Sequence, residues 1–340
     1  MSKLKKDPTS AERKKDHIDL AFSSQVDKKM VDERFVYEPL FGHSNIRIPE
    51  MKFLNKNIQL PIWVGSMTGG TNKAKAINEN LAKACNKFKM GMGLGSCRQL
   101  LDSDERLADF DLRDIIGEGQ PFYANLGIAQ IEQLLRSNQI EKVEKLIDKL
   151  RVDGIIIHIN PLQEWLQPEG DKLFQTPIAT IQQFLDRIDT SVIVKEVGQG
   201  MGKESLRTLM KLPIDAIEFA AHGGTNFSKL ELLRANESQK LLFQDIARIG
   251  HSANEMVEMV NQILVEDQGQ IKCNQFIVSG GIKNFLDGYY SIQKINATAI
   301  YGQASTLLKY AAESYDALED FIESQLRGLE LAYAYLKVKS

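Results

Sequence analysis

Eight short apolar runs, separated by stretches with helical periodicity, constrain the fold of this chain more than any other feature. The runs are rich in Ile, Val and Phe, which is typical of strands buried on both faces of a parallel sheet. Such alternation predicts an α/β fold, a (β/α)8 TIM barrel. The predicted strands lie at 60–64, 89–93, 122–126, 154–159, 192–196, 216–219, 276–278 and 298–301, with amphipathic helices at 72–87, 128–150 and 180–188.

A doubly wound open sheet has the same local signature and needs fewer strands. The glycine-rich strand ends do not form a G-x-G-x-x-G motif followed at the right distance by an acidic residue, which makes a dinucleotide-binding fold the poorer interpretation.

The segments outside the regular alternation predict how one domain, 1–340, is organised. Residues 1–50 precede the first strand as an N-terminal extension. The stretch 220–270 is too long for one βα unit, so we expect an insertion after strand 6, a long loop plus an extra helix at 226–267, that acts as a lid or an oligomer contact. Residues 313–340 carry apolar side chains at helical spacing and predict a final helix.

Composition excludes several classes of protein. The net charge of −3 argues against a nucleic-acid binder that works by bulk electrostatics. No apolar run approaches membrane-spanning length, and the N-terminus lacks an apolar signal core. The widely spaced Cys85, Cys97 and Cys273 form no disulfide framework. We therefore expect a cytoplasmic protein with no nucleic-acid or membrane partner.

The fourth predicted strand leads into polar residues of several kinds. Three isoleucines at 155–157 are followed by His158, Asn160, Gln163 and Glu164, which we expect to precede any helix. Ligands of α/β proteins bind at the carboxyl ends of strands, so these side chains indicate an active site. Glu164 is a candidate Mg²⁺ ligand because Mg²⁺ commonly takes one or two carboxylates plus substrate phosphate oxygens; the alternative is an exposed glutamate.

Glycines mark the ends of the last two strands. Ser279-Gly280-Gly281 and Gly302-Gln303-Ala304 occupy the positions where barrels often bind phosphate through backbone N–H groups. Tight turns without a ligand would produce the same pattern.

Two basic features complete the candidate site. Lys195 ends the fifth strand and could donate to a carbonyl or an anionic ring, or form a Schiff base. The alternative is an ion pair at the barrel mouth with Glu196 or another carboxylate, but charged side chains at this end are seldom needed for stability. Arg13 and His17 share one face of a predicted N-terminal helix, and with Lys14 they would suit a diphosphate. A solvated charged helix explains those three residues equally simply.

In this order, these motifs make the chain resemble the type 2, FMN-dependent isopentenyl-diphosphate delta-isomerases. The resemblance runs from Arg13-Lys14 to Gly302-Gln303-Ala304 and includes Met67-Thr68-Gly69-Gly70, Asn125-Leu126-Gly127, His158-Ile159-Asn160-x-x-Gln163-Glu164, Lys195-Glu196-Val197-Gly198, Gly223-Gly224-Thr225 and Ser279-Gly280-Gly281-Ile282. It implies a flavin-carrying barrel that interconverts isopentenyl and dimethylallyl diphosphate in isoprenoid biosynthesis.

The resemblance also implies roles for individual residues. FMN would contact Ser66, Met67, Thr68, Ser96, Asn125, Lys195, Thr225, Gly280, Gly281, Gly302, Gln303 and Ala304. The diphosphate substrate would contact Arg13, Lys14, His17, Ser96, Arg98, Asn160 and Gln163, and Glu164 would ligate Mg²⁺. Reduced FMN, formed with NADPH, would act as the acid and base, with Gln163, Lys195 and His158 as the catalytic side chains. The family is often a tetramer or octamer, so we expect a homo-oligomer.

Three positions depart from the family pattern. Position 97 is Cys where Gln is more frequent, and Gln199 and Gly202 replace an aromatic residue and a serine. None of the three coincides with a residue assigned to the chemistry.

Two other functions remain to be weighed. FMN-dependent α-hydroxyacid oxidases share barrel and flavin, but they need a His-x-x-Arg pair that none of the five histidines provides. A non-catalytic phosphate- or flavin-binding protein would not need Arg98, Gln163, Glu164 and Lys195 to converge.

Overall fold

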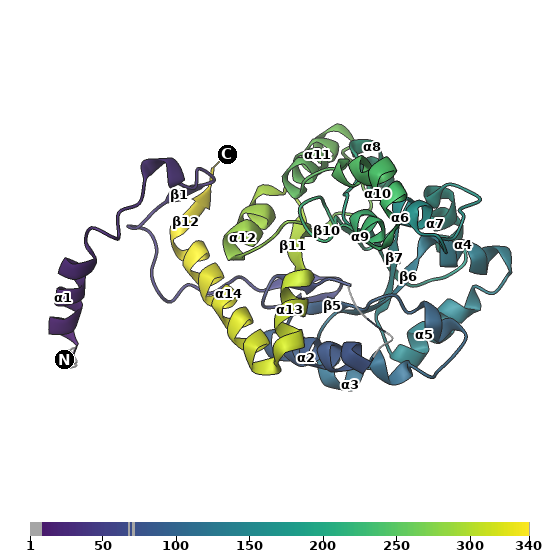
Figure 1. Cartoon of the computed structure of the whole chain (residues 1–340), viewed down its shortest axis with the longest axis horizontal. Helices are drawn as coiled ribbons and strands as arrows, with labels where there is room; N and C mark the ends of the chain where they lie inside the picture. The colour runs from purple at the N-terminus through teal and green to yellow at the C-terminus, as the bar shows by residue number, and fades with distance from the viewer. Residues whose placement is uncertain (1–8, 67–68, 70–71, 340) are drawn as a thin grey trace.

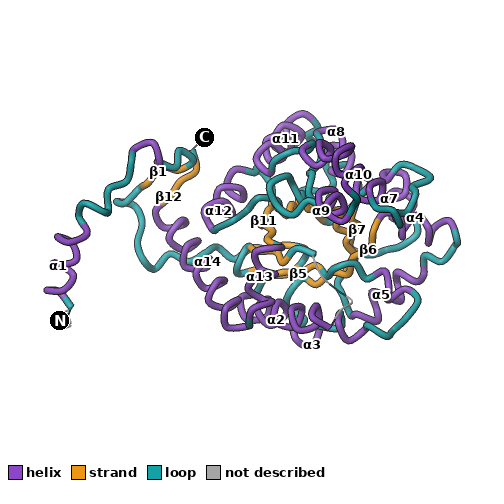
Figure 2. The backbone as a smooth tube through the Cα atoms, in the orientation of Figure 1, coloured by secondary structure: helices purple, strands orange, loops and turns teal. Residues whose placement is uncertain are grey.

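The computed structural model describes residues 9–66, 69 and 72–339, and its centre is a closed barrel of eight parallel strands. The strands follow one another around the barrel in chain order. Figure 2 shows strands in orange at the centre of the molecule, with helices around them. The predicted TIM barrel is confirmed, and each predicted strand end lies within two residues of the observed one. The strands are β4 (Ile62–Val64), β5 (Gly91–Gly93), β6 (Phe122–Gly127), β7 (Gly154–His158), β8 (Ser191–Lys195), β9 (Ala216–Glu218), β10 (Gln275–Ser279) and β11 (Thr298–Gln303).

Helices surround this barrel, and the main hydrophobic core lies between them and the outer face of the sheet (Figure 1). The covering helices are α2 (Asn72–Phe88), α3 (Arg113–Ile116), α4 (Ile128–Arg136), α5 (Glu141–Leu150), α7 (Pro177–Leu185), α8 (Lys203–Met210), α11 (Ala253–Glu266), α12 (Phe285–Lys294) and α13 (Ser305–Glu313). Short 3-10 turns η2 (Arg98–Leu101) and η3 (Leu107–Asp109) connect β5 to α3.

The predicted helix at 128–150 is two helices, because the chain turns between α4 and α5. Asn138 adopts a left-handed conformation with φ 54°, which asparagine tolerates better than most residues. An amphipathic pattern that runs through such a turn cannot be distinguished from one continuous helix by periodicity alone.

A second, smaller core fills the barrel interior. Trp63, Tyr123, Ile156, Ile193 and Ile277 point inward and pack together. The hairpin of β2 (Met51–Phe53) and β3 (Lys56–Ile58) adds Phe53 and Ile58 to this cluster and closes the amino-terminal end of the barrel. The barrel is therefore solid below its carboxyl end, and the open space lies at that end.

The stretch after β9 holds more structure than the predicted loop and extra helix. It forms α9 (Phe227–Arg234), α10 (Glu237–Phe243) and the 3-10 turn η4 (Gln244–Arg248), and then α11, which is the regular barrel helix of this unit. The insertion therefore ends before α11 begins.

The two chain ends pair with each other outside the barrel. The predicted C-terminal helix is α14 (Tyr315–Tyr335), but the chain then extends into β12 (Leu336–Val338). β12 pairs antiparallel with β1 (Phe35–Tyr37). Ahead of β1, the 3-10 turn η1 (Lys28–Met30) and helix α1 (Ser10–Leu20) project from the barrel as an arm (Figure 1).

Candidate active site

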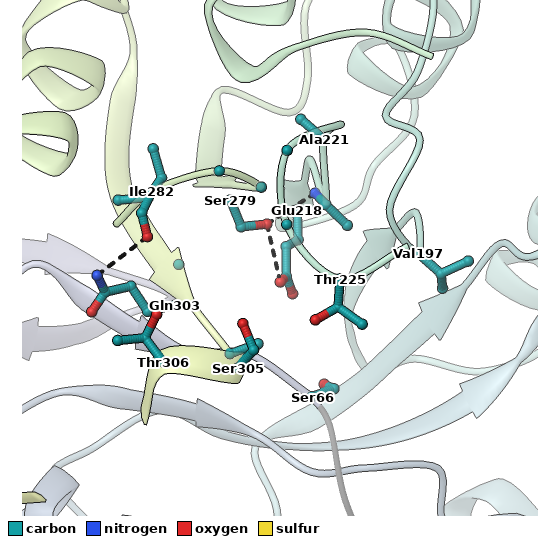
Figure 3. Close-up of a pocket in the computed structure, with 18 of the residues that line it drawn as sticks. Ser66, Val197, Glu218, Ala221, Thr225, Ser279, Ile282, Gln303, Ser305 and Thr306 are labelled. Carbon is teal, nitrogen blue, oxygen red and sulfur yellow. Dashed lines mark hydrogen bonds between the residues drawn. The ribbon is translucent and has the colours of Figure 1, made fainter. Parts of the chain in front are cut away.

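A cavity of about 1020 Å³, its open mouth included, lies at the carboxyl end of the barrel. Its walls come from the loops after β4, β8, β9, β10 and β11. Figure 3 shows several of the side chains around it. Many of the predicted cofactor residues line it: Ser66, Lys195, Thr225, Gly280, Gly281, Gly302, Gln303 and Ala304. Met67 and Thr68 lie outside the described residues.

The turn after β10 is shaped by two glycines with positive φ. Gly280 has φ 100°, and a Cβ there would lie 2.1 Å from the carbonyl oxygen of Ala221. Gly281 has φ 77°, but a Cβ there would meet nothing closer than 3.5 Å. Glycine at 280 is therefore required by the close approach of the Ala221 backbone, and the turn borders the cavity without side chains, as in a phosphate-binding turn.

Polar side chains form the top layer of the barrel interior. Each lies two residues after an apolar interior residue of the same strand and therefore points the same way. The layer comprises Asn125 on β6, His158 on β7, Lys195 on β8, Glu218 on β9 and Ser279 on β10.

His158 is held as a neutral hydrogen-bond donor within this layer. Its Nδ1 lies 2.7 Å from Oδ1 of Asn125, whose Nδ2 donates to the carbonyl of Leu94. Because Oδ1 of the amide can only accept, Nδ1 of His158 carries the proton. Burial and the charge of Lys195 lower the pKa of His158 to about 3. Asn125 thus orients His158 from the neighbouring strand and does not line the cavity.

Lys195 is buried and does not pair with the carboxylate of its neighbour. Its Nζ donates to the backbone oxygen of Glu196 at 2.8 Å. The Glu196 carboxylate instead accepts from the backbone N–H groups of Gly198, Gln199 and Gly200. Lys195 therefore keeps donor capacity for a ligand in the cavity.

The predicted substrate residues after β7 lie on a short helix, α6 (Pro161–Leu166), rather than in a loop. Asn160 precedes it and donates to both Oε1 of Gln163 at 3.1 Å and Oε1 of Glu164 at 2.9 Å. The expectation that these residues come before any helix was wrong for Gln163 and Glu164, because Pro161 begins α6 at a position where proline is favoured. It holds for His158 and Asn160.

Two further chain segments hold this helix. Nε2 of Gln163 donates to Oε1 of Glu231 on α9 at 3.1 Å. Oε2 of Glu164 accepts from the backbone N–H of Asp171, whose carboxylate pairs with Arg98 at 2.9 Å. Four predicted residues, namely Arg98, Asn160, Gln163 and Glu164, therefore belong to one connected polar network.

The residues of the β5 loop have different environments. Ser96 and Arg98 are exposed, whereas Cys97 is buried and its Sγ donates to the carbonyl of Gly95. Burial raises the pKa of the Cys97 thiol to about 12. Ser96 does not line the main cavity, and Cys97 is a packing residue.

The other two departures from the family pattern have structural positions. Nε2 of Gln199 donates to the carbonyl oxygens of Ile246 and Ile249, which ties the loop after β8 to the insertion. Gly202 is the N-cap residue of α8.

The predicted diphosphate residues of the N-terminus do not reach the cavity within one chain. Arg13, Lys14 and His17 are exposed on α1. That helix lies on the far side of the β1–β12 pair from the barrel (Figure 1).

Sequence reasoning missed two buried carboxylates of the site. Glu218 lines the cavity and Glu231 holds Gln163. A charged residue in the apolar run Ala216-Ile217-Glu218-Phe219 is the signal for the first. The second lies on a helix of low amphipathicity, and its sequence surroundings contain no signal.

The polar atoms that line the cavity fit a polar ligand such as a flavin nucleotide. Among the described residues, Ser66 Oγ, Glu218 Oε2 and Gln303 Oε1 are buried at this cavity without a hydrogen-bond partner. Buried polar atoms ordinarily have partners, so these three are suited to a bound molecule that supplies them. No group of three metal-binding His, Cys, Asp or Glu side chains occurs in the described part of the chain, so a metal ion held by Glu164 would have at most one further ligand of these types from that part of the chain.

Within residues 9–66, 69 and 72–339, none of the helices combines the length and the apolar character needed to span a bilayer.

Curated relatives match nearly the whole chain. An isopentenyl-diphosphate delta-isomerase of Rickettsia felis is 31% identical over 339 residues, which cover 97% of this chain and 94% of the relative. The Rickettsia akari protein of the same name is 31% identical and covers 94% and 91%. No protein-family model matches the sequence.

Solved structures share the fold at much lower identity. A flavocytochrome b2 mutant with benzoylformate has a TM-score of 0.62 at 12% identity and covers 89% of this chain and 75% of its own. A mandelate oxidase mutant with a monooxide FMN adduct has a TM-score of 0.53 at 14% identity, with 90% and 89% covered. Both support the barrel fold.

Proposed function

Because this chain belongs to the isopentenyl-diphosphate delta-isomerase family, we propose that it interconverts isopentenyl and dimethylallyl diphosphate. The observation that carries the proposal is the pairing of two sites at one barrel mouth. One is the cavity with buried, unpartnered polar atoms, and the other is the network around Gln163 and Glu164.

The cavity is proposed to hold FMN. The turn at Gly280 and Gly281 would receive the phosphate, and Ser66, Lys195 and Gln303 would supply polar contacts to the rest of the nucleotide. When bound and reduced, the flavin supplies a ring nitrogen that can carry and release a proton. Reduction is proposed to use NADPH.

The network on α6 is proposed to receive the diphosphate with Mg²⁺. Glu164 would ligate the metal, because its carboxylate is fixed by Asn160 and by the Asp171 amide. Arg98 would exchange its contact with Asp171 for a substrate oxygen, since arginine binds phosphate in a bidentate manner. The fixed anionic tail would then position the apolar half of the substrate for reaction.

Gln163 is proposed to hold or relay the proton on the substrate carbon. Its amide is fixed at both ends, by Asn160 at the oxygen and by Glu231 at the nitrogen. This pairing leaves little rotational freedom and supports a role that depends on exact placement. Neutral His158 would offer its Nε2 lone pair, and Lys195 a positive charge.

The N-terminal arm is proposed to complete the site of a second copy of the chain in a homo-oligomer. Ile18, Phe22 and Met30 of the arm are 74%, 86% and 76% exposed. The α6 and α10 region beside the mouth also exposes large apolar side chains, with Trp165 82% and Leu241 75% exposed. Two exposed apolar sets in one chain suit an interface between copies, which would bring the arm residues Arg13, Lys14 and His17 to the mouth of a partner.

The decisive test is anaerobic incubation of the purified protein with isopentenyl diphosphate, FMN, Mg²⁺ and NADPH in D₂O, followed by NMR. We expect dimethylallyl diphosphate with deuterium incorporated, only when the flavin is reduced. A yellow, FMN-loaded protein that does not isomerise the substrate would refute the isomerase and retain the flavin site.

The variant Gln163→Ala refines this test. We expect kcat to fall by about 10²–10⁴, as for a lost proton-transfer group, while FMN binding stays unchanged. Unchanged turnover would remove Gln163 from the chemistry.

A further inference from the structure

Glu218 is the one carboxylate in the top layer of the barrel interior, as far as the structure describes the chain. It is 2% exposed and lines the cavity. Figure 3 shows its carboxylate directed into the cavity, on the same side as the Thr225 hydroxyl. A carboxylate this deeply buried needs compensation by charge or by hydrogen bonds.

The hydrogen bonds of Glu218 satisfy only half of its carboxyl group. Oε1 accepts from Oγ of Ser279 at 3.3 Å, and that hydroxyl itself accepts from the Ala220 amide at 2.9 Å. Oε2 has no partner. The indole of Trp63 also faces the carboxyl, without a hydrogen bond of normal length. One oxygen therefore remains available to a proton or to a ligand in the cavity.

Lys195 is the charge that compensates Glu218. The two residues are register partners on β8 and β9, and both line the cavity. No ion pair joins the two side chains directly; the Lys195 ammonium instead donates to the Glu196 backbone oxygen at 2.8 Å. The positive charge of Lys195 can therefore interact both with Glu218 and with a ligand bound in the cavity.

Among the described residues, Lys195 on β8 is the charged group facing Glu218. Ser279 on β10 and Trp63 on β4 are its other close neighbours, and neither titrates near neutral pH. Burial raises the pKa of Glu218, and Lys195 opposes that rise. A ligand that draws the charge of Lys195 toward itself would therefore favour protonation of Glu218.

We propose that Glu218 takes up a proton when the bound flavin is reduced, so that the site gains two protons for two electrons. One proton goes to ring nitrogen N5 and the other to the Glu218 carboxylate, while Lys195 compensates the negative charge of the reduced ring. The electrons come from a hydride donor or from dithionite. The inference rests on the proposed FMN site and adds a proton-accepting carboxylate in the wall of the same cavity.

The test measures the midpoint potential of the FMN-loaded protein between pH 6 and 8 by dithionite titration. A couple with two protons per two electrons shifts by about 59 mV per pH unit, and one with a single proton by about 30 mV. We expect the steeper slope in the parent and the shallower slope in Glu218→Gln. Glu218→Asp, which keeps the carboxyl group, should restore the steep slope.

Ser279→Ala is the matched control, because it disturbs the same carboxyl without removing it and should keep the steep slope. Equal slopes in the parent and in Glu218→Gln would overturn the proposal. The reduced-minus-oxidised infrared spectrum of the parent needs no variant: it should gain the C=O band of a protonated carboxyl group, and absence of that band would also overturn it. Failure to bind FMN at all would instead refute the flavin site of the proposed function.

Discussion

Neutral His158 predicts a measurable loss of stability in mild acid. Its pKa is lowered from 6.5 to about 3 by burial and by Lys195, its register partner on the next strand. As the pH falls below 6.5, the unfolded chain binds a proton on this histidine and the folded chain does not. Stability is therefore present above the unfolded pKa and is lost as the pH falls toward the folded one.

The size of this stability loss follows from the difference between the pKa of His158 in the unfolded and folded states. One pKa unit corresponds to about 1.4 kcal/mol, so at pH 5 the unfolded state gains about 2 kcal/mol relative to pH 7.5 through this one residue. The figure depends only on the folded pKa lying well below 5, because protonation of the folded state is then negligible.

The assay is urea unfolding of the parent and of His158→Gln at pH 7.5, 6 and 5, with FMN saturating throughout. Other titrating groups contribute equally to both proteins, so the difference between the two pH dependences isolates His158. We expect the free energy of unfolding to fall by about 2 kcal/mol more in the parent than in the variant. Parallel curves would refute the reasoning, since His158 would then be protonated in the folded state. A neutral His158 also predicts the pH profile of isomerase turnover. Titration of His158 should cause no loss of turnover near pH 6.5, so the parent and His158→Gln should show the same profile there.

Three other predictions concern ligand binding. Gly280→Ala should weaken FMN binding more than Gly281→Ala. Both positions have positive φ, but only the first places a Cβ 2.1 Å from a backbone atom. Equal dissociation constants by fluorescence titration would count against the turn as a phosphate site. Glu164→Gln should raise the Mg²⁺ concentration for half-maximal activity, and an unaltered metal titration would remove Glu164 as a ligand. Mixing Arg13→Ala with Gln163→Ala protein should restore activity, because some hybrid oligomers combine an intact N-terminal arm from one chain with an intact barrel site from the other. If activity does not recover, the arm serves the barrel of its own chain.

Strand periodicity predicted the barrel because a parallel sheet covered on both faces requires nearly continuous apolar runs. The same alternation also predicts which side chains of each strand point into the barrel. Ala216 points into the barrel, so Glu218, two residues on, must point into its mouth. The motifs predicted Lys195 as a site residue but did not include Glu218, its register partner on the next strand.

Other features depend on tertiary contacts that sequence patterns do not report. The bond from Gln163 to Glu231 joins α6 to α9, whose residues are separated by 68 positions. The position of α1 depends on the pairing of β1 with β12 at the other end of the chain. Their charge made Arg13 and Lys14 candidates for binding the diphosphate. Whether they reach the barrel of their own chain or that of a second copy depends on tertiary packing.

The arrangement of the top layer separates two electrostatic environments at one mouth. His158 is neutral and hydrogen-bonds to Asn125, whereas Lys195 and Glu218 line the cavity. His158 and Lys195 are register partners, so the boundary between the two environments is the width of one strand spacing.

A double-bond shift needs a proton delivered at one carbon and removed at another, without release of either to water. If the substrate binds beside neutral His158 and the flavin beside Lys195 and Glu218, proton transfer between substrate and flavin would cross that boundary. Exchanging the charges, as in a His158→Lys, Lys195→His double variant, should therefore abolish isomerisation even if FMN and diphosphate still bind, and activity retained in that variant would show that the separation is incidental.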